Sequence, residues 1–290
     1  MPTPSEEKPA VSFLSIVVTV KNEAAHLSQL LDSLAGQEPP FEIVLVDAFS
    51  EDRTPEIARK FEELHPGLLR FIQAQGKRGA GRNFGARLAK GDYLVFTDGD
   101  CVADSQWLSS IRVGLKSSKV VAGKTTTIGN PGYVNLERVE LYQGDVDLTY
   151  PSCNLAYERR LFEKLGGFDD RFVTAEDIDL NLRAVRSGAT IHYRPDAVVY
   201  HNTRMNLTRF LIQAFWNGYG RKQLTEKHGQ LWSRYRYRRM LDTQKTLLAN
   251  VRLIAALAGY FTRLATVSGT KERIRPEPAQ RPVTEGATKG

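Results

Sequence analysis

The ten residues 91–100, GDYLVFTDGD, constrain the fold of this chain more than any other segment. Residues 93–97 form a short apolar run between glycine-containing turns, a pattern typical of a buried strand in a parallel sheet. The run ends in two carboxylates, Asp98 and Asp100, with one glycine between them. Residues i and i+2 of an extended segment point to the same side, and ligands of open α/β sheets bind beyond the carboxyl ends of the strands. The pair therefore suits Mg²⁺ or Mn²⁺, although Asp-Gly-Asp is also common in solvated turns.

The segments before this one alternate between strand and helix patterns. Apolar, β-branched runs predict three strands, at residues 13–20, 41–46 and 68–73. The segments between them predict a helix at residues 24–35, a helix from Thr54-Pro55 onward, and a glycine-rich basic loop at 76–85 that runs into a helix ending at Leu88. This order predicts an α/β fold with a doubly wound, mostly parallel sheet and helices on both faces. Polar residues follow the strands at one edge of this sheet: Lys21, Glu23, Asp47, Asp98 and Asp100.

The second half of the chain is less regular. We expect strands at residues 120–128, 191–193 and 198–200, the last of them ending at His201. We also expect helices at residues 133–147, at 159–165, and from Thr174 to Gly188 with Glu176 and Asp177 in its first turn.

Composition bounds the class of protein. The chain has 290 residues, of which 41% are hydrophobic and 25% charged, which is enough apolar material for a packed core. Its two cysteines, Cys101 and Cys153, have neither metal-site nor disulfide-scaffold spacing, so a reducing compartment is expected. The N-terminal residues have no secretory pattern, and we find no stretch of about 18 uncharged apolar residues, so we expect neither a signal peptide nor a spanning helix.

The net charge of +7 is unevenly distributed. Residues 202–275 contain 15 Lys and Arg against three acids, so the rest of the chain is acidic. An acidic body with a basic C-terminal segment predicts contact between that segment and a polyanion, either a membrane surface or a nucleic acid.

The glycine-rich segment 76–85 and Asp47 indicate a phosphate-containing ligand. Backbone N–H groups of such a loop can approach phosphate, with Arg78 and Arg82 supplying charge. A strand-end acid such as Asp47 can accept a hydrogen bond from a base or ribose. The sequence lacks GxxxxGK[ST], which excludes a P-loop NTPase, and lacks GxGxxG after the first strand, which argues against a nicotinamide cofactor.

Four segments in a fixed order resemble one enzyme family. They are SIVVTVKNE, VLVDAFSEDRT, GRNFGARLAKGDYLVFTDGD, and GGFDDRFVTAEDIDLNLRAVRSGATIHYRPDAVVYH. Each is loose alone, but together, over about residues 14–201, they look like the inverting family 2 glycosyltransferases with the GT-A fold. The resemblance implies a Rossmann-like catalytic domain, and the residues after it predict a C-terminal helical extension.

The resemblance also implies roles for individual residues. On the donor side it assigns the nucleotide-sugar contacts to Thr19, Lys21, Glu23, Asp47, Arg82 and Asp98. It implies that Asp98 and Asp100 form the DXD motif that holds Mg²⁺ or Mn²⁺ on the donor diphosphate, with His201 as a further metal ligand. Asp177 matches the general base, and we place Glu176 and Trp216 on the acceptor side.

These roles have a physical account. A bound cation stabilises the charge that builds on the leaving diphosphate, and Asp177 can take the proton of an acceptor hydroxyl that attacks from the opposite face. The helix dipole favours an ionised Asp177, whereas the nearby acids Glu176 and Asp179 oppose its ionisation. Asp177 also fits a plain N-terminal helix acid, and His201 fits a structural histidine.

The sequence departs from the family pattern at two points. Ala48 stands where a second acid usually follows Asp47, which indicates altered or looser base recognition. The QxxRW motif of processive polysaccharide synthases is absent, so transfer of a single sugar is expected.

The C-terminal part predicts basic helices. Residues 210–220 are helix-like, residues 234–239 alternate arginine with tyrosine, and apolar residues recur at helical spacing over 240–269 with Arg252 and Arg263 among them. This pattern resembles an amphipathic helix on an anionic membrane with its arginines at the headgroups, and the alternative is a helix packed on the catalytic domain. We favour a membrane over a nucleic acid, which makes a lipid-linked acceptor plausible and predicts a cytoplasmic protein peripheral to the membrane.

We therefore predict four regions: a disordered segment 1–12, a catalytic domain 13–205, a basic helical region 206–269, and a disordered tail 270–290. The catalytic domain divides into a nucleotide-sugar half, 13–104, and an acceptor half, 105–205. The predicted activity is metal-dependent, inverting transfer of one sugar to a hydroxyl or lipid-phosphate acceptor, in the assembly of glycolipid, cell-surface polysaccharide or glycoprotein glycan. The alternatives are a sugar-phosphate nucleotidyltransferase, which would require a glycine-rich, arginine-containing loop where Lys21-Asn22-Glu23 stands, and a non-catalytic membrane-binding module.

Overall fold

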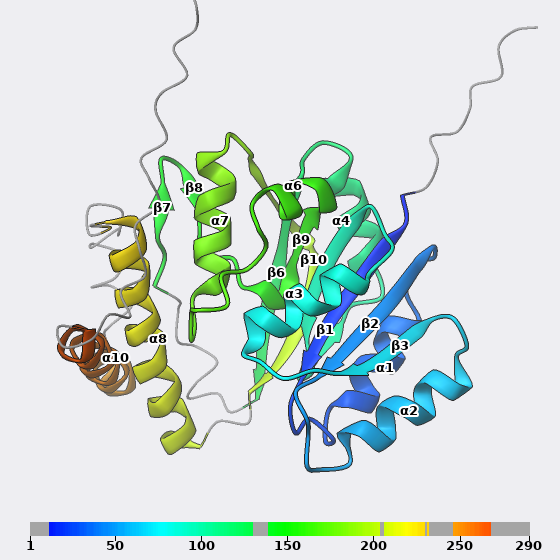
Figure 1. The fold of residues 1–290 in the computed structure, drawn as a ribbon, viewed down its shortest axis with the longest axis horizontal. Helices are drawn as coiled ribbons and strands as arrows, with labels where there is room; N and C mark the ends of the chain where they lie inside the picture. The colour runs from blue at the N-terminus through cyan, green and yellow to red at the C-terminus, as the bar shows by residue number, and fades with distance from the viewer. Residues whose placement is uncertain (1–11, 130–138, 204–205, 230, 232–245, 268–290) are drawn as a thin grey trace, which may run out of the picture.

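The computed structural model describes residues 12–129, 139–203, 206–229, 231 and 246–267. These residues form a mixed eight-stranded sheet with helices around it, and a pair of long helices lies beside it (Figure 1). The strand order is β3-β2-β1-β4-β9-β6-β10-β5. The predicted α/β class, with a mostly parallel sheet and a C-terminal helical part, is confirmed.

The first half follows the predicted alternation of strands and helices. Its four parallel strands are β1 (Leu14–Val20), β2 (Phe41–Asp47), β3 (Leu69–Gln73) and β4 (Tyr93–Asp98). The helices that connect them are α1 (Leu27–Ala35), α2 (Thr54–Leu64) and α3 (Arg78–Leu88). The central strands β1, β2 and β4 are buried on both faces, which is why their sequences are continuous apolar runs.

Two cores lie on opposite faces of the sheet. One packs α1, α2 and α4 (Trp107–Leu115) against the strands, and the other packs α3, α6 (Arg159–Lys164) and α7 (Glu176–Arg186). We did not predict α4 from the sequence. Its Trp107 is fully buried and donates from Nε1 to Oδ1 of Asn154 at 2.8 Å, which fixes α4 to the short turn η1 (Ser152–Asn154).

The second half of the sheet is mixed. Its strands are β5 (Cys101–Ala103), β6 (Val120–Gly129), β9 (Leu155–Glu158) and β10 (Ile191–Thr203). β9 lies antiparallel between β4 and β6. The two short strands predicted at 191–193 and 198–200 are one strand, β10, with a register shift between Arg194 and Val198. His201 therefore lies inside β10 rather than at its end.

The glycine-rich segment 76–85 is mostly helix rather than the predicted loop, because α3 begins at Arg78. Its glycines serve packing. A Cβ on Gly85 would lie 2.6 Å from Cγ1 of Val17, and one on Gly81 would lie 3.1 Å from Cγ2 of Thr19. Glycine at these positions lets α3 approach the strand β1 closely, so the segment offers a helix face to the sheet instead of a phosphate-binding loop.

The helix predicted at 133–147 is wrong for the part that the structure describes. Residues 139–147 contain β7 (Tyr142–Gln143) and β8 (Val146–Asp147), a two-stranded hairpin. Gly144 has a φ of 58°, so it makes the turn in a conformation that glycine adopts without strain. The first part of that prediction, and the disorder predicted for residues 1–11 and 270–290, lie outside the described residues.

The C-terminal pair consists of α8 (Leu207–His228) and α10 (Leu247–Val267). The two helices cross very closely, because a Cβ on Gly218 would lie 1.7 Å from the carbonyl oxygen of Ala256 and one on Gly259 would lie 1.9 Å from that of Phe215. Residues 247–266, with a mean hydropathy of 1.3, are long and apolar enough to cross a membrane. Only 17% of this apolar stretch is buried within the protein. We expected no such segment from the sequence. The core helix of a soluble protein can have the same length and apolar composition.

Candidate active site

Polar residues meet at one edge of the sheet, as the sequence predicts. Thr19 on β1 lies opposite Asp98 on β4, and Val20 lies opposite Asp47 on β2. Because these three strands are parallel, their carboxyl ends reach the same edge. The structure therefore brings Thr19, Asp47 and Asp98 together.

The loops after β1 and β2 are bound to each other at this edge. The backbone N–H groups of Asn22 and Glu23 donate to the hydroxyls of Ser50 and Thr54, at 2.7 and 2.8 Å. Asn22 has a φ of 56° and Phe49 a φ of 54°, left-handed values that cost energy in residues other than glycine and gather at functional sites. The predicted donor contacts Lys21 and Glu23 belong to the first loop, where Lys21 is exposed and Glu23 half-buried.

Asp47 is fully buried, and its carboxylate already has partners. It accepts from the backbone N–H of Ser50 at 3.1 Å and from Nε2 of Gln73 at 2.9 Å. Asp47 therefore holds the loop after β2 and the end of β3 in place. That Asp47 also binds the base of a nucleotide stays a prediction.

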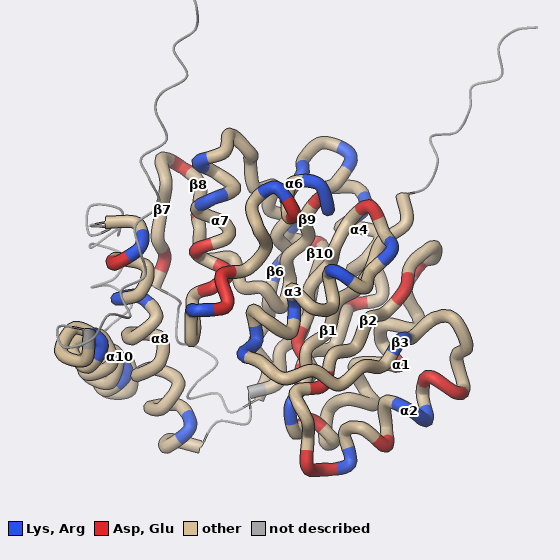
Figure 2. The backbone as a smooth tube through the Cα atoms, in the orientation of Figure 1, with Lys and Arg blue, Asp and Glu red and all other residues tan. Residues whose placement is uncertain are grey.

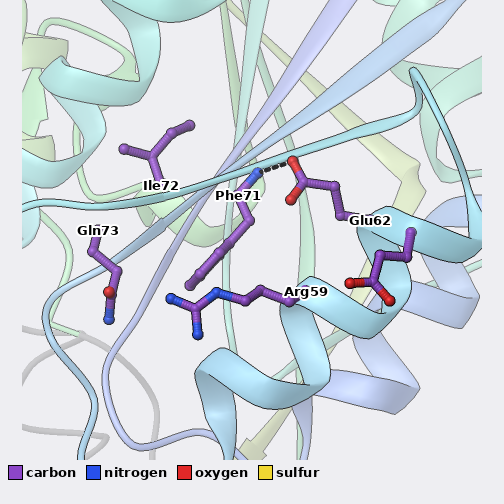
Figure 3. A pocket seen from close by; sticks show the side chains of 6 residues that line it. Arg59, Glu62, Phe71, Ile72 and Gln73 are labelled. Atoms are coloured by element: carbon purple, nitrogen blue, oxygen red, sulfur yellow. Dashed lines mark hydrogen bonds between the residues drawn. The ribbon is translucent and has the colours of Figure 1, made fainter.

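A surface pocket of about 440 Å³ borders Gln73 along the edge strand β3 (Figure 3). Its wall includes the ring of Phe71 under the guanidinium of Arg59, with 5.4 Å from Cζ to the ring centroid. The N–H of Phe71 donates to Oε1 of Glu62 at 2.9 Å, so this group on the edge of the sheet is paired within the chain. Gln73 links this pocket to Asp47, because it lines the pocket and its Nε2 donates to Asp47.

Arg82 is the central cation of the site. Its side chain is 1% exposed, and it donates to Oδ1 of Asp98 at 2.6 Å and to Oε1 of Glu176 at 2.8 Å. Burial opposes the charge on Arg82, but the two carboxylates raise the pKa of Arg82 above its ordinary value. Burial likewise opposes ionisation of Asp98, and Arg82 outweighs it and lowers the Asp98 pKa. Arg82 thus joins the end of β4 to the start of α7.

The three predicted metal ligands divide into two groups. Nε2 of His201 lies 3.3 Å from Oδ1 of Asp100, whereas Asp98 is turned to Arg82. Among the described residues, Asp100, Cys101 and His201 have ligand atoms within 4.8 Å of one another. Two ligands of a single ion lie up to about 4.6 Å apart when each is about 2.3 Å from it, so Asp100 and His201 fit a divalent cation. Burial alone would lower the pKa of His201, but its hydrogen bond to Asp100 raises that pKa to about 9.

Asp177 stands in the first turn of α7, after Ala175, which has a left-handed φ of 68°. Oδ2 of Asp177 accepts from the N–H of Ser152 at 3.2 Å, and Oδ1 accepts from the N–H of Ile178 at 2.8 Å. Burial, followed by the negative charge of Glu176, raises the pKa of Asp177 to about 6 despite these hydrogen bonds and Arg82. A carboxylate with this pKa can accept a proton near neutral pH.

Asp179 does not act on Asp177 as we expected from the sequence. Its fully buried carboxylate contacts Arg183 and Lys227, each at 2.8 Å, and His228 at 2.7 Å. Burial opposes its ionisation, but these partners lower the pKa of Asp179 to about 2. The charge of Asp179 is therefore matched within a cluster that fastens α7 to α8.

Helix α8 also holds the segment that leads into Asp177. The hydroxyl of Thr174 donates to the carbonyl of Trp216 at 2.8 Å, and the N–H of Val173 donates to Oε1 of Gln223 at 3.1 Å. A Cβ on Gly220 would lie 2.5 Å from the carbonyl oxygen of Thr174. Trp216, which we predicted on the acceptor side, is 39% exposed, and its backbone carbonyl accepts the hydrogen bond from Thr174.

Comparison with known proteins identifies the family. The sequence matches the model of the family described as Glycosyl transferase family 2 over residues 15–166, which is more than half of the chain. The chain belongs to glycosyl transferase family 2. The predicted family, GT-A fold and glycosyltransferase class of enzyme are thereby confirmed.

Relatives of this family 2 chain are diverged. It is 27% identical over 224 residues to the glycosyltransferase AglE of Haloferax volcanii, covering 66% of this chain and 67% of that protein. A mannosyltransferase from Pyrobaculum calidifontis, solved with GDP-Man and Mn²⁺, has a TM-score of 0.59 at 20% identity, covering 89% of this chain and 75% of that one. TarS of S. aureus, solved with UDP, has a TM-score of 0.56 at 18% identity, covering 90% and 93%. The chain spans about half the length of two further curated relatives that it matches.

Several residues around the predicted site were not expected from the sequence. Cys101 directly follows Asp100, so its position in the sequence was a usable signal. Lys227 and Gln223 lie far along the chain, and no local motif marks them. The Glu176 contact with Arg82 was also unforeseen, because it depends on α3 and α7 sharing one face of the sheet.

We expect Gly220→Ala to loosen the segment before Asp177. The added Cβ would press on the backbone of Thr174, and overpacking of this kind costs about 1–3 kcal/mol of stability. Denaturant unfolding should show that loss, and hydrogen exchange should speed up at residues 173–179. Gly36→Ala is the matched control, because its Cβ would have no contact nearer than 3.8 Å. Unchanged exchange in Gly220→Ala would contradict the coupling.

Proposed function

We propose that this chain catalyses inverting, divalent-cation-dependent transfer of one sugar from a nucleotide-diphospho sugar to a hydroxyl or lipid-phosphate acceptor. The observation that carries the proposal is the Arg82 bridge between Asp98 and Glu176. The bridge sets the predicted general base, Asp177, next to the carboxyl edge of the sheet, where the predicted donor residues meet. Sugar transfer requires the base that accepts the acceptor's proton to lie beside the residues that bind the donor.

The donor class is supported by the relatives. Structural neighbours are described as complexes with UDP, UDP-GlcNAc, and GDP-Man with Mn²⁺. Thr19, Lys21, Glu23 and Asp47 lie at or beyond the ends of β1 and β2, as such a donor would require. Family membership also favours sugar transfer over a nucleotidyltransferase or a non-catalytic module.

The residues have distinct tasks in the proposed reaction. Asp100 and His201 would hold Mg²⁺ or Mn²⁺, whose chemistry is neutralisation of the charge on the leaving diphosphate. Arg82 keeps Asp98 ionised beside them. Asp177 takes the proton from the acceptor hydroxyl as that oxygen attacks, and its raised pKa makes it a stronger base than a solvated aspartate.

We further propose that the C-terminal helices contact an anionic membrane, which would present a lipid-linked acceptor on its cytoplasmic face. The outward face of α10 is apolar, with Leu247, Ile254, Leu257, Phe261 and Leu264 exposed. Residues 234–245, next to this helix in the sequence, supply four arginines and Lys245, a charge pattern that complements anionic headgroups.

The two arginines of α10, which the sequence pattern predicts at the headgroups, are not among its fully exposed residues. Arg263 is buried and donates to Oε2 of Glu226 on α8 at 3.0 Å, and Arg252 is half-buried. Basic positions also recur along α8 (Figure 2). The proposed membrane contact is therefore an apolar stripe on α10.

A thermal-shift screen of nucleotide sugars with and without Mn²⁺ tests the donor and the cation together. A ligand at about 100 times its Kd should raise Tm by about 5 °C, and we expect that shift only when both components are present. Asp100→Ala should abolish the Mn²⁺-dependent shift, because it removes a cation ligand. Asp92→Ala, at the opposite end of β4, should keep it. A wild-type shift that is independent of Mn²⁺ would contradict cation dependence.

The pH dependence of transfer tests Asp177. With saturating donor and cation, kcat should rise with pH through about 6, because the base must be ionised to accept a proton. Glu176→Gln should move this limb to lower pH, since the charge of Glu176 helps to raise the pKa of Asp177. Asp177→Asn should stop transfer but spare the donor-induced thermal shift. An acidic limb that stays in place in Glu176→Gln would count against Asp177 as the base.

Vesicle sedimentation tests the membrane contact. The protein should sediment with vesicles that contain phosphatidylglycerol and far less with phosphatidylcholine alone, and added salt should weaken the binding. Replacing Ile254 and Phe261 by Asp should reduce the partition by about 100-fold, since each buries a large apolar side chain. Leu64→Asp, at an exposed apolar position on α2, is the control. Equal binding by the double variant and the wild type would exclude this stripe.

A further inference from the structure

Cys101 has no role in the proposed reaction, yet its thiol lies at the cation site. Strand β5 pairs antiparallel with β10, and Cys101 is directly opposite His201. Directly opposed residues of an antiparallel pair project from the same face of the sheet, with Cβ atoms about 4.5–5.5 Å apart. Sγ of Cys101 lies 4.0 Å from Oδ1 of Asp100, and the ligand atoms of Asp100, Cys101 and His201 lie within 4.8 Å of one another.

We propose that Asp100, Cys101 and His201 form a three-ligand site for a borderline-soft divalent cation of the Zn²⁺ and Co²⁺ class, with the sulfur of Cys101 as a direct ligand. This inference shares Asp100 and His201 with the proposed function and adds a thiolate to them. The thiolate shifts the preference of the site from Mg²⁺ and Mn²⁺ toward Zn²⁺ and Co²⁺.

The donor set decides which ions the site prefers. Carboxylate oxygens suit Mg²⁺ and Mn²⁺, imidazole suits Zn²⁺, and thiolate strongly favours the softer ions. Divalent affinity also rises from Mn²⁺ to Co²⁺ for most nitrogen, oxygen and sulfur sites, and Zn²⁺ lies above Mn²⁺ as well. One oxygen, one nitrogen and one sulfur ligand leave a tetrahedral ion with one open position, the arrangement of catalytic rather than closed structural zinc sites. A phosphate oxygen or water can take that position.

A second buried cysteine, Cys153, neighbours Cys101. In the ion-free protein Cys153 and burial raise the pKa of Cys101, so a bound cation has to displace the thiol proton. Sγ of Cys153 also lies 3.8 Å from Oγ1 of Thr125. Partners of this kind hold a metal ligand in orientation. Cys153 itself is absent from the convergent group, so we assign it the supporting position and Cys101 the direct one.

Binding at this site exchanges protons for the ion without any change of oxidation state. The cation replaces the thiol proton of Cys101 and, where His201 is charged, the imidazolium proton as well. Both protons pass to solvent.

Cobalt spectroscopy of the full chain tests the proposal without donor or acceptor. Titration of metal-free protein with Co²⁺ under reducing conditions should produce a sulfur-to-Co²⁺ charge-transfer band in the near ultraviolet that saturates at one ion per chain. Cys101→Ser should lose the band and bind Co²⁺ at least about 10–100-fold more weakly, because even the loss of a supporting partner costs that much. Cys153→Ser is the matched control and should keep the band. Zn²⁺ should displace Co²⁺ and abolish the band at a far lower concentration than Mg²⁺ does.

Each outcome decides the question. A wild-type protein without the band, or a Cys101→Ser protein that keeps it, overturns the proposal. Loss of the band in Cys153→Ser but not in Cys101→Ser also overturns it, because Cys153 is then the ligand. Circular dichroism of both variants shows that the fold is intact. Because the band needs no nucleotide sugar, a protein that shows it but transfers no sugar contradicts only the proposed function.

Discussion

The site depends on a covalent constraint: only Gly99 and Asp100 separate the end of β4 from the start of β5. β4 and β5 stand four places apart in the strand order, so the sheet must curl until its β5 edge lies beside the carboxyl end of β4. A Cβ on Gly99 would lie 2.6 Å from Cγ1 of Val20, so glycine is required for this link to pass the end of β1. The curl brings β10, which pairs with β5, over the same edge, and His201 reaches Asp100 as a result.

The same link separates the two acids of the DGD sequence. Asp98 is the last residue of β4 and forms an ion pair with Arg82, whereas Asp100 contacts His201. The i, i+2 argument from the sequence, which places both carboxylates on one side, holds for a continuous strand, and here the chain turns at Gly99. Arg82 also binds Glu176, so a charge change at Asp98 or at Glu176 reaches the other acid through one buried guanidinium. Such a bridge is costly to break, because removing one partner leaves a buried charge unpaired.

The sequence predicts the first half of the fold well because its information there is local. Strands β1, β2 and β4 are buried on both faces and read as apolar runs, and Asp47 and Asp98 follow from the position of those runs. The antiparallel insertion of β9, the short β5 and the Cys101–His201 pair depend on register between distant strands, which no local period encodes. The phosphate-binding loop predicted from the glycines of α3 was wrong for a related reason. Such glycines fit a phosphate loop and a tightly packed helix equally well, and only the proximity of Val17 shows that they serve helix packing.

Helix α8 has two different faces, and this connects the membrane proposal to the chemistry. Its inner face holds polar groups that bind the start of α7 and the segment before it, namely Lys227 to Asp179, Gln223 to Val173, and the Trp216 carbonyl to Thr174. Its other neighbour is α10, against which Gly218 packs at backbone contact. Close glycine contacts and buried ion pairs transmit displacement, because packed interfaces of this kind deform little. A surface that orients α10 therefore orients α8 with it, and through Thr174 the segment that sets Asp177 at the carboxyl edge of the sheet.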